Sequence, residues 1–155
     1  MKKLEEIESF LIKARAKTYA GDEGRVKAVL DNSTQLEYRK DNWLYRDIYY
    51  TGKNTFYGIE TVFHNSKPVF GMSYYGNWGS MTEKEIDEIL RGALTLNPET
   101  RLYKKIEWKK GNFVYSCDPD LKGGIREIGG TERITKNGKQ IYVLYYAGSI
   151  LTEQV

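Results

Sequence analysis

Residues 36–45 read LEYRKDNWLY, and residues 106–115 read IEWKKGNFVY. The two stretches share a Glu, a Lys, an Asn and the final Tyr, and their apolar positions match in kind. A second match joins ETVFHNSKPVF at 60–70 with ERITKNGKQIY at 132–142. The offsets are 70 and 72 residues, and self-similarity at a nearly constant offset is the signature of a structural repeat. We therefore expect one copy at about residues 3–76 and a second at about 82–148.

Each copy contains the signals of four strands joined by short turns. Asn137-Gly138 is the strongest signal, because both central residues of a type I′ hairpin turn need a positive φ. Asn65-Ser66 occupies the matching place in the first copy. We predict strands at about 35–40, 43–50, 55–64, 68–75, 104–109, 112–117, 125–136 and 139–147.

A helix is predicted ahead of each set of strands. Apolar residues recur there at three- and four-residue spacing, which places them on one helix face. The second helix begins after Thr82, an N-cap residue that Glu85 completes as a capping box, and it ends before Pro98. The two apolar stripes are Leu4, Ile7, Phe10, Leu11 and Ala14, then Ile86, Ile89, Leu90, Ala93 and Leu94.

A four-strand meander with one helix buries too little apolar surface to be stable alone, so the two copies should share a core. The predicted fold is α+β, with two tandem helix-plus-four-strand antiparallel meander repeats related by a pseudo-two-fold axis. Both helices should lie on one sheet face. The 155 residues are expected to form one domain.

The composition is that of a globular protein with an excess of tyrosine. There are 13 Tyr residues, and this β-favouring, amphipathic side chain suits a wet sheet face or a binding surface. The net charge of +3 is spread along the chain, so a nucleic-acid partner is not expected. The single Cys cannot form an internal disulfide, and no apolar run has the length of a signal or a membrane span. We therefore expect a cytoplasmic protein without a membrane partner.

Catalytic and metal-binding motifs are not found in the sequence. His64 and Cys117 are the only residues of their types, which excludes a zinc site of the Cys/His type. No glycine-rich nucleotide motif occurs, so no cofactor and no catalytic residue are predicted. Glu60 and Glu132 occupy equivalent places in the two copies, where a paired site could bind a ligand or transfer protons. The favoured interpretation is cross-strand salt bridges on a wet sheet face.

Two segments differ between the copies and suggest a binding site. One is the loop from Thr18 to Arg25 after the first helix, and the other is residues 74–79, where aromatic rings border glycines. Rings can stack on a planar ligand, and Arg25 could offer a forked donor to phosphate or carboxylate. The predicted ligand-binding residues are Tyr19, Arg25, Tyr45, Glu60, Tyr74, Trp78, Glu132 and Tyr146.

Three stretches resemble a known family. They are Thr18-Tyr19-Ala20-Gly21, Leu36-Glu37-Tyr38 leading into Trp43-Leu44-Tyr45, and Met72-Ser73-Tyr74-Tyr75-Gly76. This pattern is similar to the bacterial and phage family called domain of unknown function 5680, over nearly the whole chain. Some members carry the domain behind an Xre-type helix-turn-helix module, which implies a sensory or ligand-binding role. Here only one helix is predicted before the first strand, and the resemblance implies no catalytic residue.

Three functions follow as hypotheses. The leading one is a non-enzymatic ligand-binding or regulatory module for a small anionic or aromatic ligand, such as a nucleotide-like molecule. The alternative is a protein-interaction module, such as a homodimer that buries exposed tyrosines and strand edges. The third is an enzyme that uses the carboxyl groups of Glu60 and Glu132.

Overall fold

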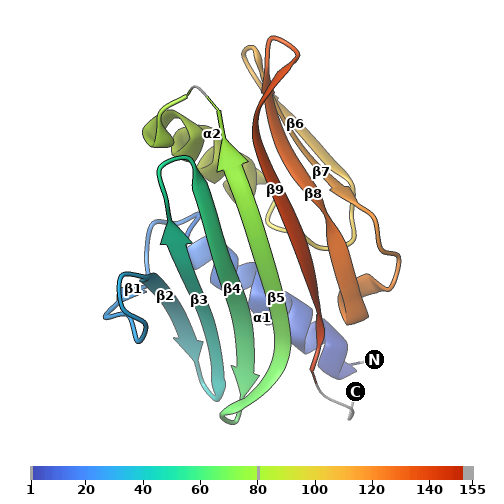
Figure 1. Cartoon of the computed structure of the whole chain (residues 1–155). Helices are drawn as coiled ribbons and strands as arrows, with labels where there is room; N and C mark the ends of the chain where they lie inside the picture. Colours follow the sequence, from blue (N-terminus) through green and yellow to red (C-terminus); the bar gives the residue numbers. More distant parts are fainter. Residues whose placement is uncertain (1, 80, 152–155) are drawn as a thin grey trace.

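One antiparallel sheet of nine strands, in the order β1-β2-β3-β4-β5-β9-β8-β7-β6, is present in the computed structural model, which describes residues 2–79 and 81–151 (Figure 1). Two α-helices cover one face of this sheet, here called the helical face. The other face, here called the open face, is turned toward the viewer in Figure 1.

The elements follow one another with short connections. In chain order they are α1 (Lys2–Lys17), β1 (Arg25–Val26), β2 (Thr34–Lys40), β3 (Trp43–Thr51), β4 (Thr55–His64), β5 (Lys67–Trp78), α2 (Glu83–Leu96), β6 (Ile106–Lys110), β7 (Phe113–Pro119), the 3₁₀ turn η1 (Gly124–Arg126), β8 (Glu127–Lys136) and β9 (Lys139–Ile150).

The predicted hairpin turns and helix ends are confirmed. Asn137 and Gly138, between β8 and β9, have φ values of 50° and 78°, as a type I′ turn requires. Thr82 caps α2, and the side chain and backbone of Glu85 complete the capping box. The predicted strands also occur, but β6 begins at Ile106 instead of residue 104, and residues 124–126 form a 3₁₀ turn at the predicted start of β8.

The prediction of two helix-plus-four-strand repeats is wrong. Strands β5 and β9 pair with each other in continuous register, from Phe70 with Ile150 to Trp78 with Tyr142, so all the strands belong to one sheet. The short strand β1 adds a further strand beside β2. The matching stretches resemble each other because both contain alternating apolar and polar residues and the same turn-forming residues, which are common to antiparallel hairpins. They do not report which strand edges meet in the folded chain.

The core lies between the helical face and the two helices. Ile7, Leu11 and Ala14 of α1 are fully buried. The stripe of α2 is also buried, as the 3.6-residue period predicts. Both stripes pack on side chains from central strands, among them Val62, Phe70, Tyr115, Ile134 and Leu144. No helix in residues 2–79 and 81–151 is both long and apolar enough to cross a membrane.

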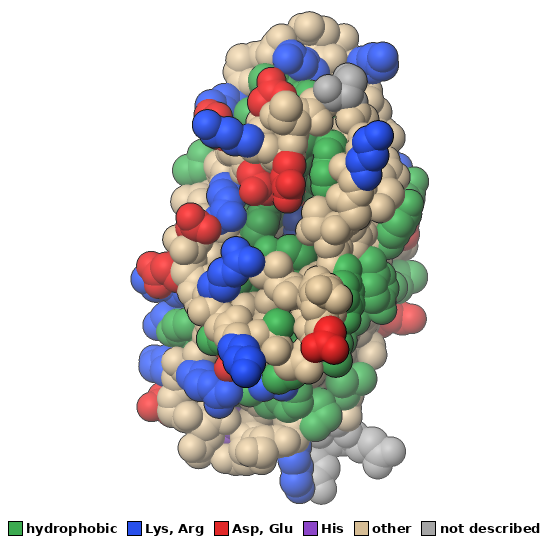
Figure 2. Space-filling view, turned by 60° about the vertical axis from the view of Figure 1, so that its left-hand side comes forward, with side chains coloured by type: hydrophobic (Ala, Val, Ile, Leu, Met, Phe, Trp, Pro, Cys, Tyr) green, Lys and Arg blue, Asp and Glu red, His purple; other side chains and the backbone are tan. Residues whose placement is uncertain are grey.

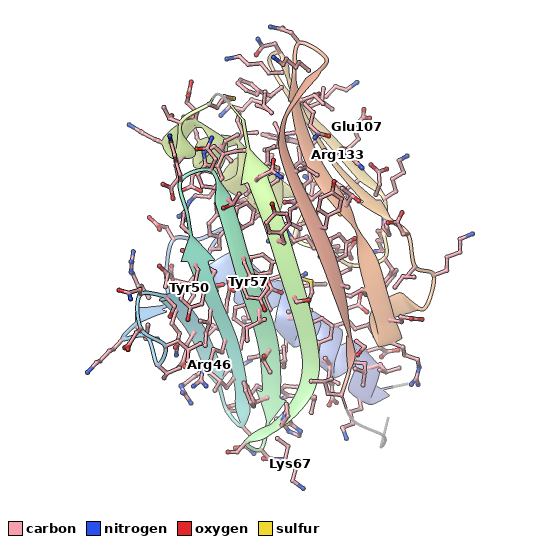
Figure 3. All side chains as sticks on the ribbon, in the orientation of Figure 1. Arg46, Tyr50, Tyr57, Lys67, Glu107 and Arg133 are labelled. Atoms are coloured by element: carbon pink, nitrogen blue, oxygen red, sulfur yellow. The ribbon has the colours of Figure 1, made fainter. Side chains whose placement is uncertain are left out.

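The open face carries a row of tyrosines. Tyr50, Tyr57, Tyr75 and Tyr145 are consecutive register partners on β3, β4, β5 and β9. Their exposed fractions are between 39% and 52%. Figure 3 shows Tyr50 and Tyr57 in front of the sheet, on the side away from the helices. The row therefore points to solvent.

Candidate functional site

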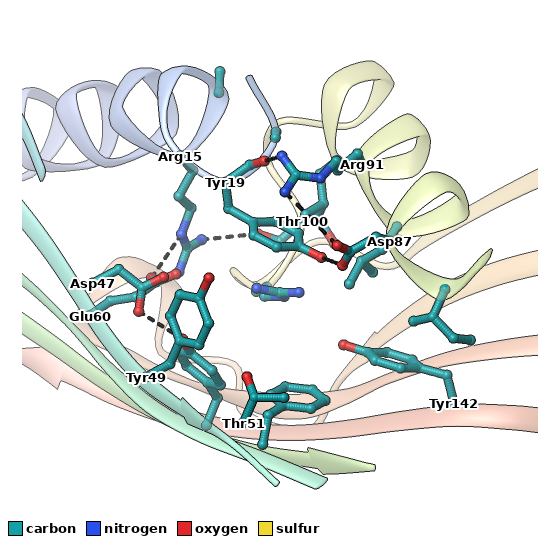
Figure 4. Close-up of a pocket in the computed structure, with 18 of the residues that line it drawn as sticks. Arg15, Tyr19, Asp47, Tyr49, Thr51, Glu60, Asp87, Arg91, Thr100 and Tyr142 are labelled. Carbon is teal, nitrogen blue, oxygen red and sulfur yellow. Dashed lines mark hydrogen bonds and ion pairs between the residues drawn. The ribbon is translucent and has the colours of Figure 1, made fainter. Parts of the chain in front are cut away.

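A cavity of about 120 Å³ lies between the helical face and the helix layer. Its floor comes from β3, β4, β5 and β9, and its walls come from the end of α1, from α2 and from residues 98–101. Figure 2 shows a hollow on one side of the molecule with acidic side chains beside it. Figure 4 shows the side chains of both layers projecting into the space between them.

Aromatic rings form most of the floor. Tyr45, Asp47, Tyr49 and Thr51 alternate along β3, and residues two apart on a strand point to the same face. Phe56 of β4 stacks on two further lining rings, which belong to Trp78 and Tyr142 and have centroids 6.0 and 5.9 Å away. The cavity therefore offers flat apolar surface with hydroxyl groups at its edges.

Arg15 and Glu60 form a buried ion pair on one side of the cavity. Nε and Nη2 of Arg15 donate to Oε2 of Glu60 at 2.9 and 2.5 Å, and Nη1 donates to the carbonyl of Thr100 at 3.1 Å. Burial by itself lowers the pKa of Arg15, but the charge of Glu60 leads the opposing effects, and the net pKa is raised. The guanidinium group is therefore fully charged and already paired.

Arg101 and Glu132 form a second buried ion pair. Nε and Nη2 of Arg101 donate to the two carboxylate oxygens of Glu132 at 2.8 and 2.9 Å. The hydroxyl groups of Tyr115 and Tyr142 donate to the same oxygens at 2.5 and 2.8 Å. Four donors fill the usual acceptor positions of this carboxylate, which is fully buried.

Asp47 differs from both glutamates. It lies opposite Glu60 in the β3–β4 register and is 5% exposed. The Tyr74 hydroxyl donates to its Oδ1 at 2.7 Å, and among the described residues it has no salt bridge. Burial, followed by the charge of Glu60, raises the pKa of Asp47 to about 7. Its carboxyl group therefore titrates near neutral pH.

Tyr19 joins the end of α1 to α2 at the rim. Its hydroxyl donates to Asp87, and its backbone carbonyl accepts from Nη1 of Arg91 at 2.5 Å. The Arg91 guanidinium also lies over the Tyr19 ring, 4.6 Å from its centroid, and forms a 3.0 Å salt bridge with Asp22. These contacts join the segment after α1 to α2.

Five of the eight predicted binding residues line this cavity: Tyr19, Tyr45, Glu60, Tyr74 and Trp78. The other three lie elsewhere. Arg25 is exposed on β1, and Glu132 is paired with Arg101 but does not line the cavity. Tyr146 is buried and donates to the carbonyl of Leu102 at 3.0 Å. A forked contact from Arg25 to a ligand in this cavity therefore has no support.

The prediction that Glu60 and Glu132 form cross-strand salt bridges on a wet sheet face is wrong. Both side chains lie on the helical face and are buried, at 2% and 0% exposure. Their partners are arginines from the helix layer rather than from neighbouring strands. Strand periodicity fixes the face on which a residue lies, but the covering element decides whether that face is wet.

Several lining residues were missed from the sequence. Asp47 and Tyr49 could have been found, because they follow Tyr45 at the strand period. Arg15 follows Leu11 by four residues on the buried stripe of α1. Arg101 has no such signal, since it lies in a turn with a φ of 56°.

The only cysteine and the only histidine of the sequence do not line the cavity. Cys117 is buried, and burial raises the pKa of its thiol. His64 stacks on Trp43 at 4.2 Å, at the end of the β4–β5 hairpin. In the part of the chain that the structure describes, no group of three or more His, Cys, Asp or Glu side chains could hold a metal ion.

Comparison with known proteins gives one match. The model of the family described as domain of unknown function (DUF5680) matches residues 47–151. This range contains β4 to β9, α2 and most of β3, but not α1 with Arg15. No curated protein and no solved structure matches the chain.

Proposed function

We propose that this chain, which belongs to the DUF5680 family, is a non-enzymatic module that binds a small organic molecule. The observation that carries the proposal is the cavity of about 120 Å³ between the helical face and the helices. Its aromatic lining, with hydrogen-bonded polar groups held in place around it, is typical of a small-molecule site.

The size of the cavity limits the ligand. An apolar cavity of ~150 Å³ accepts a benzene molecule, so the enclosed part of the ligand is about the size of one ring. A nucleotide-sized ligand would have to project from the mouth. Burial of roughly 100 Å² of apolar ligand surface contributes on the order of 2.5 kcal/mol, which favours a planar apolar body against Tyr49 and Phe56.

A fragment screen tests this proposal. Ring-sized compounds should raise the melting temperature of the protein, since a ligand selective for the folded state stabilises it. Thr51 lies at the edge of the cavity, so Thr51→Trp should fill the space and abolish these shifts. Thr55→Trp is the matched control, because Thr55 flanks the same hairpin and is also exposed but lies on the open face by strand alternation. Fragments that stabilise both variants equally, or no active fragment at all, would contradict the proposal.

The tyrosine row favours a second function, the assembly of two copies through their open faces. Strand spacing of ~4.8 Å makes the row roughly 15 Å long, and exposed aromatic rings are enriched at interface cores. Light scattering after size exclusion should then give a dimer that Tyr57→Lys with Tyr75→Lys converts to a monomer. A wild-type monomer at all concentrations would exclude this assembly.

A further inference from the structure

We infer that the ligand is a protonated amine on an aromatic or apolar body, with the carboxylate of Asp47 as its counter-ion. This inference rests on the proposed binding function and adds the chemical class of the ligand. Three observations support it: the charge balance of the lining, the open acceptor position on Asp47, and the aromatic surface beside that position.

The charge balance favours a cation. The lining contains four carboxyl side chains and three guanidinium groups. Each guanidinium group already has a carboxylate partner: Arg15 pairs with Glu60, Arg101 pairs with Glu132, and Arg91 pairs with Asp22 and Asp87. An anionic ligand would meet no unpaired arginine among these residues and would be repelled by Asp47. The lining therefore supports an aromatic ligand, as expected from the sequence, but does not support an anionic one.

Asp47 has an acceptor oxygen that faces the cavity. The Tyr74 hydroxyl occupies one position on Oδ1, and no hydrogen bond or ion pair of the described residues reaches Oδ2. Among the described residues, every fully buried side-chain oxygen or nitrogen has a hydrogen-bond partner. Because Oδ2 has none, it is not fully buried, and it is accessible from the cavity that Asp47 lines. A ligand N⁺–H donor would complete this carboxylate with a charge-assisted hydrogen bond.

The surroundings of Asp47 suit an ammonium group attached to a ring. Tyr45 and Tyr49 flank it on β3, and the electron-rich face of a tyrosine attracts a cation. Phe56 is four residues along β4 from Glu60, the register partner of Asp47. Phe56 lines the same cavity, so its ring can pack against the apolar body of the ligand.

Binding of such a ligand should depend on pH. Asp47 faces Glu60 from β4, Tyr74 from β5, Arg15 from α1 and Arg101 from the segment after α2. Without a ligand, burial and Glu60 keep the pKa of Asp47 at about 7. An ammonium group needs the ionised carboxylate, so its affinity should increase as pH rises from 6 to 8.

Three probes of matched shape test the inference: phenethylamine, 2-phenylethanol and 3-phenylpropionate, which differ at the end of one phenylethyl group. Titrations of the full chain at pH 8 by two-dimensional NMR should give a Kd for phenethylamine at least ~10-fold below that of the alcohol, or ~1.4 kcal/mol, and the propionate should bind weakest. Tighter binding of the alcohol or the propionate would overturn the amine inference and leave the binding function intact. If none of the three shifts cavity resonances, the inference fails, and the fragment screen decides the proposed function separately.

Asp47→Asn separates charge from shape. Asn keeps an acceptor for the Tyr74 hydroxyl but removes the negative charge, so the preference for the amine over the alcohol should disappear. Unchanged binding of the alcohol shows that the variant cavity is intact. Asp118→Asn, on a partly exposed carboxylate paired with Lys105 and Arg133, is the control and should keep the preference. An amine preference that persists in Asp47→Asn would overturn the inference.

Discussion

Asp47 and Glu60 lie opposite each other on β3 and β4, and both side chains are buried on the helical face. Glu60 has a guanidinium partner in Arg15, whereas Asp47 has only the hydroxyl of Tyr74. Two neighbouring carboxylates with one cation cannot both be ionised without cost. This imbalance underlies the proposed ligand class and several measurable properties of the protein.

The stability of the protein should depend on the protonation of Asp47. Burial and the charge of Glu60 raise its pKa from 3.8 to about 7. Between these values the folded protein binds a proton that the unfolded chain lacks, so stability falls as pH rises through this window, by at most ~1.4 kcal/mol per pH unit. Asp47→Asn should remove this loss and become more stable, relative to wild type, at pH 8 than at pH 5. Urea unfolding of both proteins measures the difference, and parallel pH curves would contradict it.

Removal of Arg15 should be strongly destabilising. Arg15→Met leaves the buried carboxylate of Glu60 without its cation, which costs ~3–5 kcal/mol in comparable cases. The double variant Arg15→Met with Glu60→Gln should recover most of that loss. Lys104→Met is the control, because its pair with Glu99 is half exposed and such pairs contribute less than ~1 kcal/mol. Equal losses in Arg15→Met and Lys104→Met by urea unfolding would refute the buried pair.

A methyl group at Gly58 should disturb the cavity floor. A Cβ at this position would lie 2.3 Å from the hydroxyl oxygen of Tyr74 and 2.8 Å from Cβ of Tyr49. Gly58→Ala should therefore displace Tyr74 from Asp47, destabilise the fold by ~1–3 kcal/mol and weaken ligand binding. In Gly71→Ala the new Cβ meets the flexible end of Leu151 at 3.2 Å, so its effect should be small. Equal stability and binding in the two variants would contradict this packing.

Loss of the Tyr19 hydroxyl should loosen the rim. Tyr19→Phe removes the hydrogen bond to Asp87 but keeps the ring under Arg91, so the stability loss should be ~0.5–1.5 kcal/mol. Hydrogen exchange should become faster at the end of α1 and the start of α2. Tyr57→Phe, on the open face, should change neither quantity. Unchanged exchange in Tyr19→Phe would show that the hydroxyl does not join the two helices.

Much of the local structure could be predicted from the sequence because its signals are local. Asn137-Gly138 fixes one hairpin through backbone φ, and the Thr82–Glu85 capping box fixes the start of α2. The pairing of β5 with β9 could not be predicted in the same way. It joins strands far apart in the chain, and its register is set by contacts that form only in the folded sheet.

The part of the candidate site that depends on local strand alternation could also be predicted from the sequence. Tyr45 and Tyr74 point to the helical face by strand alternation, and the same alternation places Asp47 beside them. The partner of Glu60 comes from a helix 45 positions earlier in the chain. No strand pattern reports that contact, so a buried ion pair was mistaken for a solvated one.

A crystal structure of the protein with phenethylamine at pH 8 tests the central claim most directly. We expect the compound between the helices and the sheet, with its nitrogen ~2.7–2.9 Å from an oxygen of Asp47 and its ring against Tyr49 or Phe56. The same compound bound only on the open face, or a cavity that holds no compound at saturating concentration, would contradict the claim.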